Sequence, residues 1–135
     1  MFIPWKTPDP FIRLVSITEQ ATGYQLTLAS VNTTATCPTC HCRTAKRHST
    51  YTRHLQDLPC VAVTIRLTAT KWHCPTTTCT QRIFTERFSW LTPYARRTIR
   101  ATNLLRYFAF SSSCFVAAKI AKVTGLAVSH DTLLR

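Results

Sequence analysis

The sequence predicts an α+β fold, in which a small β-rich unit comes first and a helical unit follows. Apolar and polar residues alternate with a period of two in the N-terminal part, and an apolar stripe with helical spacing begins only after about residue 91. Two close cysteine pairs flank the longest alternating run. With 135 residues, the chain can form one ordinary domain or two very small ones, so we expect a small unit to need added stabilisation.

The β-rich part contains three predicted strand regions. Residues 11–31 form two β-rich runs separated by a turn-like break at Gly23, which predicts a hairpin within an N-terminal unit at 1–36. Within residues 60–72, positions 61–70 alternate with a period of two, which predicts a strand with one apolar face and one polar, partly basic face. A further short strand is expected at 82–88.

The cysteine pairs predict a metal site. The spacings Cys-x2-Cys and Cys-x4-Cys each allow one tight turn, and two such knuckles held together by strands form a tetrahedral four-thiolate site for zinc. Binding of one structural ion supplies folding free energy on the order of 10 kcal/mol. We therefore interpret residues 37–90 as a zinc-finger β unit, zinc-ribbon-like in character. The four expected ligands are Cys37, Cys40, Cys74 and Cys79.

Other uses of the cysteines stay open. Cys42 can replace Cys40, or His73 can replace Cys74, and all the cysteines can instead be small apolar residues. Cys60 and Cys114 are isolated, so we expect each to be an ordinary buried thiol. Because a nucleophilic cysteine needs a base held beside it, the paired arrangement argues against catalysis by a thiol.

The helical part occupies residues 91–135, and its last helix is short. An apolar stripe predicts the first helix, the serines at 111–113 are expected to end it and cap the second, and Gly125 ends the second. Ser129 is a good N-cap for a third, whose leucines at 133–134 are expected to face the core. The layout is that of a helix-turn-helix, although a plain pair of packed helices has the same pattern. The stripe comprises Ala101, Leu104, Leu105 and Phe108.

The charge distribution predicts a polyanionic partner. The chain has 17 lysines and arginines against 5 acids, a net charge of +12. Most of the excess lies between Arg43 and Arg106, where Asp57 and Glu86 are the only acids and are interpreted as partners of nearby arginines. Nucleic acid is the expected partner and an anionic membrane surface the competing one. A solvated strand face is the alternative without a partner.

Double-stranded DNA is the partner we expect, and its predicted contacts fall in three groups. The tract behind the first knuckle supplies phosphate contacts and one ring, two arginines lie beside the helical stripe, and three polar residues begin the recognition helix. These residues are Arg43, Lys46, Arg47, His48, Tyr51, Arg53, Arg96, Arg100, Ser129, His130 and Thr132. No small-molecule substrate is expected. Because charges and prolines interrupt the first ten residues and no apolar run spans a bilayer, we expect a cytoplasmic protein without a membrane partner.

The ordered motifs resemble a known family. CPTC, HSTYTRHLQDLP, the alternating strand, WHCPTTTC, RIFTERF and TGLAVSHDTLLR are similar, in that order, to the N-terminal region of bacterial insertion-sequence transposases of the ISL-three type. The resemblance covers nearly the whole chain from about Leu14. It departs from the family at His41, where the knuckle usually has glycine, and at the serines of 111–113, which replace a glycine-containing turn.

The resemblance implies zinc on the four paired cysteines and binding of element ends by the helices. A catalytic DDE domain follows these parts in the family, and we expect this chain to be a truncated form that lacks it. Because the five scattered acids do not make a carboxylate triad, we expect no catalysis from this chain alone. A full-length transposase is a further expected partner, whose sites the chain can occupy. Alternatives are a piece of a split or frame-shifted active transposase, or a zinc protein that binds RNA or another protein.

Overall fold

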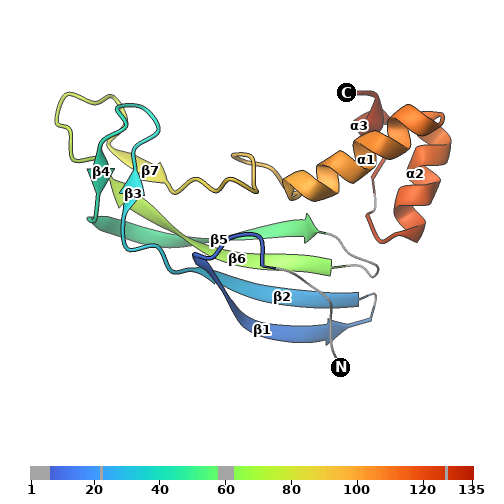
Figure 1. Ribbon diagram of the computed structural model, residues 1–135, viewed down its shortest axis with the longest axis horizontal. Coiled ribbons are helices and arrows are strands. Elements are labelled where there is room, and N and C mark those ends of the chain that lie inside the picture. The colour runs from blue at the N-terminus through green and yellow to red at the C-terminus, as the bar shows by residue number, and fades with distance from the viewer. Residues whose placement is uncertain (1–6, 22, 58–62, 127) are drawn as a thin grey trace.

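The computed structural model describes residues 7–21, 23–57, 63–126 and 128–135. In these ranges the chain is α+β, as the sequence predicts, with a mixed sheet and three short helices (Figure 1). The strands are β1 (Ile12–Gln20), β2 (Gly23–Ser30), β3 (Ala35–Thr36), β4 (Arg43–Thr44), β5 (Arg47–Asp57), β6 (Val63–His73) and β7 (Ile83–Thr85), and the helices are α1 (Ile99–Ser111), α2 (Cys114–Val123) and α3 (His130–Leu134). The small strands β3, β4 and β7 lie at one end of the molecule and the helices at the other (Figure 1).

The main sheet has the strand order β1-β2-β6-β5, and β7 pairs with the end of β6. β1 and β2 form the antiparallel hairpin predicted at 11–31, and β5 and β6 form a second antiparallel pair. β2 runs parallel to β6, with Leu26 opposite Ile65 and Leu28 opposite Leu67. The N-terminal hairpin and the strands of the cysteine-bearing unit are therefore parts of one sheet.

The apolar face of this sheet forms the main core. The predicted alternation in β6 is confirmed, since its apolar residues are buried while Thr64 and Arg66 are exposed. The segment after β7 covers this face of the sheet. The helical pattern predicted from about residue 91 is realised only from Ile99, where α1 begins, so residues 91–98 are not helical. The buried members of this core are Ile12, Leu26, Leu28, Leu55, Val63, Ile65, Leu67, Ala69, Phe88, Trp90 and Leu91.

The three helices pack around a smaller core of their own. The predicted stripe on α1 is confirmed, and it meets Ala121 of α2 and Leu126. Leu133 packs against this core, but the prediction for Leu134 is wrong, because its side chain is 69% exposed. No helix in the described ranges is long and apolar enough to cross a membrane.

The predicted helix boundaries are confirmed by their caps. Ser113 accepts a hydrogen bond from the Val116 N–H at the start of α2. At its end, the N–H of Leu126 donates to Ala121 and that of Gly125, at φ 85°, donates to Lys122, which is the Schellman arrangement. This arrangement turns the chain sharply from α2 toward α3.

A buried carboxylate joins the sheet to the helices. The Asp57 side chain, at the end of β5, is fully buried, forms an ion pair with Arg100 and accepts a hydrogen bond of 2.6 Å from the Thr98 hydroxyl. The same hydroxyl caps α1 by accepting from the Ala101 N–H, and the hydrogen bond with Asp57 raises the pKa of Arg100. The first turn of α1 is thereby fixed to β5.

The two acids expected to pair with arginines have different roles. The prediction is confirmed for Asp57 and wrong for Glu86. The buried Glu86 carboxylate accepts from the Thr70 N–H, at 2.8 Å, and from the side chains of Ser30 and Asn32. It therefore connects β6 to the segment that leaves β2, where a carboxylate without these donors would be costly to bury.

Replacing Asp57 tests whether this junction stabilises the fold. We expect Asp57→Asn to lower the free energy of unfolding by about 2 kcal/mol, since it removes a charge-assisted hydrogen bond from a buried position. Urea denaturation followed by circular dichroism measures the change. The control Arg96→Gln alters an exposed arginine of the neighbouring segment and should change stability by less than about 0.5 kcal/mol. Equal stability of the two variants would contradict the role given to Asp57.

Candidate functional site

The sheet topology explains why the two cysteine pairs meet. Parallel strands have their carboxyl ends at the same edge of a sheet. The chain leaves β2 for the first pair and leaves β6 directly for the second, so both pairs are delivered to one edge. β5 starts at this same edge because it runs antiparallel to β6.

The four paired thiols form one cluster. All four sulfur atoms lie within 4.8 Å of one another, with 3.4 Å between the Sγ atoms of Cys40 and Cys74 and 4.0 Å between those of Cys37 and Cys79. A tetrahedron with metal–sulfur bonds of about 2.3 Å has edges of about 3.8 Å, close to both distances. The cluster can therefore hold one metal ion, as the sequence predicts.

The first knuckle is a tight turn between β3 and β4. The N–H of Cys37 donates to the carbonyl of Cys42 at 3.0 Å, and the N–H of His41 donates back to Cys37 at 2.9 Å. His41 has φ 60°, the left-handed conformation that glycine adopts most easily. The turn of the first knuckle therefore requires a positive φ at a residue that is not glycine.

The second knuckle is held to the first by more than its thiols. The Cys74 N–H donates to Arg82 and the Cys79 N–H to Thr76 within this knuckle. The Thr39 hydroxyl donates to the side chain of Gln81 across the two turns at 2.8 Å. These bonds orient the sulfur atoms toward a common centre.

The protonation of the thiols is strongly perturbed. A hydrogen bond with the Thr76 hydroxyl lowers the pKa of Cys40 to about 6, whereas burial raises the pKa of Cys74 to about 12. A backbone hydrogen bond lowers the pKa of Cys79, but burial and neighbouring thiols raise it on balance. Closely spaced thiols oppose ionisation of one another, and a bound cation removes this opposition.

Little apolar core supports this end of the molecule. Among the residues that the structure describes, the apolar cluster here has three buried members, Cys37, Trp72 and Phe84, with the other three paired cysteines and Ala35 packed against them. β3 and β4 have two residues each. Since so small a cluster buries little apolar area, bound metal is expected to contribute much of its stability.

Cys42, Cys114 and the alternative ligand His73 lie outside the cluster. Cys42 is exposed, and His73 packs its ring edge-on against His48 with centroids 4.9 Å apart. Cys114 is only half-buried, which corrects the expectation of a buried thiol. The prediction for Cys60 lies outside the described residues.

The predicted DNA contacts do not form one continuous site. Arg43, Lys46, Arg47 and His48 are exposed at the cysteine end, at or near the start of β5. Some of these side chains already have protein partners. The guanidinium of Arg43 donates to Thr34, and that of Arg47 lies over the Trp72 ring, 5.5 Å from its centroid.

The contacts predicted on the helices lie at the opposite end of the sheet (Figure 1). Ser129 caps α3 through the Thr132 N–H, and the His130 ring stacks on Phe115 at 4.4 Å between centroids. Arg96, in the segment between β7 and α1, is exposed, whereas Arg100 forms an ion pair with Asp57.

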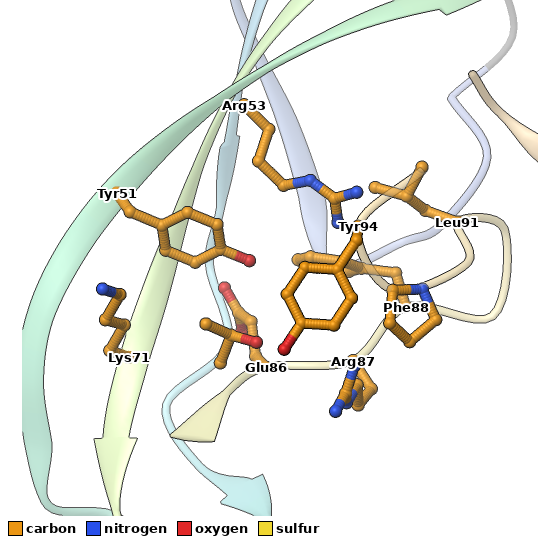
Figure 2. A pocket seen from close by; sticks show the side chains of 10 residues that line it. Tyr51, Arg53, Lys71, Glu86, Arg87, Phe88, Leu91 and Tyr94 are labelled. Carbon is orange, nitrogen blue, oxygen red and sulfur yellow. The ribbon is translucent and has the colours of Figure 1, made fainter. Parts of the chain in front are cut away.

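Tyr51 and Arg53 lie at a pocket whose other functional side chains the sequence did not indicate. Lys71, Arg87 and Tyr94 join them around a cavity of about 300 Å³ (Figure 2). The alternating pattern of β6 does not distinguish Lys71 from the other polar residues of the strand. No sequence pattern predicts the positive φ of Tyr94, which follows Pro93. Only the excess of arginine and lysine in this span pointed to the region.

Comparison with known proteins adds no identification: no protein-family model, no curated protein and no solved structure matches the chain.

Serine substitutions test the four-thiol site. We expect Cys40→Ser and Cys79→Ser to lower the affinity for divalent metal by more than about 100-fold, because each removes a ligand rather than a supporting group. Elemental analysis of the purified proteins gives the metal content. The matched control is Cys42→Ser, two positions away and outside the cluster, which should keep one equivalent. Loss of metal from Cys42→Ser and its retention by Cys40→Ser would contradict the ligand set.

Metal removal should loosen one end of the molecule selectively. The main core does not include the cysteines. Treatment with a chelator is therefore expected to speed amide hydrogen exchange in residues 35–44 and 74–85 while residues 64–69 stay protected. Exchange measured by mass spectrometry distinguishes this from global unfolding, in which all three segments lose protection together, and from no response at all.

Proposed function

We propose that the chain is a DNA-binding module whose cysteine end is held together by one structural zinc ion. The four-thiol cluster carries the proposal, because four sulfur ligands at nearly tetrahedral spacing, without an adjacent open position, are typical of structural zinc. In this proposal the cysteine end is zinc-ribbon-like, and the metal fixes the start of β5 as a rigid, basic platform.

The charge supports a nucleic-acid partner. A net charge of +12 with five acids leaves most cations without a carboxylate, and two of those acids are used inside the fold. The exposed cations at the start of β5 and Arg96 can neutralise phosphates along a duplex. Phosphate contacts of this kind position the protein, and base contacts are needed for sequence specificity.

The helices support duplex DNA as the particular partner. α2 and α3 are joined by a sharp turn at Gly125, and α1 packs across them, as in a helix-turn-helix. α3 is the recognition helix in this proposal, with Ser129, His130 and Thr132 at its start. Its five residues are few for a stable helix, so binding to DNA is expected to order it further.

The resemblance to insertion-sequence transposases supports a particular DNA target. The chain corresponds to the end-binding region of such an enzyme, and the DNA sites are the terminal repeats of the element. We assign no strand-transfer chemistry to the chain itself, since Asp57 and Glu86 are engaged in structural hydrogen bonds. By occupying terminal repeats that a full-length transposase needs, the chain would inhibit transposition by that enzyme.

Fluorescence anisotropy with labelled duplexes tests the proposal. We expect tighter binding to the inverted repeats that flank the coding sequence than to a scrambled duplex, and a linear fall of log K with log salt concentration. Lys46→Gln and Arg96→Gln should each reduce the slope by about one. Arg13→Gln, an exposed cation on β1 outside the proposed contacts, is the matched control.

Each alternative has its own outcome in the same assay. Equal affinity for repeats and scrambled DNA would contradict end recognition. Stronger competition by RNA than by duplex would favour an RNA-binding zinc protein, and absence of binding to either would favour a protein partner. Cleavage of the repeats that requires magnesium and a separately encoded acidic chain would favour a split transposase.

A further inference from the structure

The pocket beside β5 has the composition of a nucleotide-binding site. Its floor includes the buried Phe88 and Leu91, and Tyr51 and Tyr94 line its sides (Figure 2). Its volume of about 300 Å³ lies at the lower end of the range of about 300 to 1,000 Å³ typical of small-ligand pockets. An apolar floor with aromatic walls suits a flat base.

Tyr94 combines an uncommon backbone conformation with a highly exposed side chain. Its backbone has φ 62°, which is uncommon for a bulky residue, and its side chain is 92% exposed. Arg53 donates hydrogen bonds to the carbonyls of Thr92 and Ala95, at 3.4 and 2.6 Å, on either side of it. Strained residues of this kind concentrate at functional sites. Arg53 is thus a positioning residue for the Tyr94 loop.

Two cationic side chains, Lys71 and Arg87, also line the pocket and can bind a phosphate group. The Lys71 ammonium is 5.8 Å from the centroid of the Tyr51 ring, and Arg87 is exposed below Tyr94 in Figure 2. The one carboxylate of the lining, Glu86, is buried, and both its oxygens accept hydrogen bonds from other protein groups. The pocket thus presents more positive than negative charge to a ligand.

We propose that this pocket binds an unpaired nucleotide of DNA. The base stacks on the exposed ring of Tyr94, and its phosphate is held by Lys71 and Arg87. This inference rests on the proposed DNA-binding function and adds to it a preference for duplexes that offer an unpaired strand. Stacking on aromatic rings tolerates any base, so the pocket contributes affinity without sequence specificity.

A duplex with a short single-stranded extension tests the inference against the same duplex with blunt ends. We expect the extended duplex to bind more tightly, and a 2-aminopurine placed in the extension to lose fluorescence on binding as it stacks. Tyr94→Asn removes the ring but tolerates the left-handed backbone, and it should weaken binding of the extended duplex by about fivefold or more. Affinity for the blunt duplex should not change.

Two further variants separate stacking from folding. Tyr94→Phe keeps the ring and should bind as the unmodified protein does. The control is Tyr107→Ala, which removes another exposed tyrosine, from α1. Equal affinity for blunt and extended duplexes would overturn the pocket's role while leaving duplex binding intact. An extension effect that survives Tyr94→Asn would also overturn it. Failure to bind either duplex would overturn the proposed function itself.

Discussion

The parallel pairing of β2 with β6 determines where the cysteine pairs lie and how the strands combine into one sheet. It brings the carboxyl ends of two strands that are distant in sequence to one edge, and both cysteine pairs follow from there. The same pairing merges the N-terminal hairpin and the β5–β6 pair into one sheet with a shared core. The four-thiol cluster at this edge, which can hold a metal ion, is therefore a consequence of strand direction as well as of cysteine spacing.

The molecule is organised as three small cores with different sources of stability. Among the described residues, the sheet has the largest apolar core, the helices have a smaller one, and the apolar cluster of the cysteine end has three buried members. Asp57 joins the first two through Arg100 and Thr98. In our account the metal replaces the missing core at the third, and this leaves the surface at the start of β5 free to carry positive charge.

Much of this organisation was predictable because local patterns report local geometry. Alternation in β6, the stripe on α1, the serine caps and the paired cysteines each depend on neighbouring residues, and the structure confirms them. The parallel register was not predictable, since a period of two shows which face a strand buries but not which strand it pairs with. The hydrogen bonds of Glu86 and the left-handed backbone of Tyr94 likewise depend on contacts between distant segments.

X-ray absorption at the zinc edge identifies the atoms that are bound to the metal. If the four paired thiols hold a structural zinc ion, protein purified with zinc will show four sulfur scatterers at about 2.3 Å and no bound nitrogen or oxygen. A mixed shell with histidine nitrogen would show that His41 or His73 replaces a thiol. A folded protein without bound zinc would contradict the account, since the cysteine end would then have to be stable on its small apolar cluster alone.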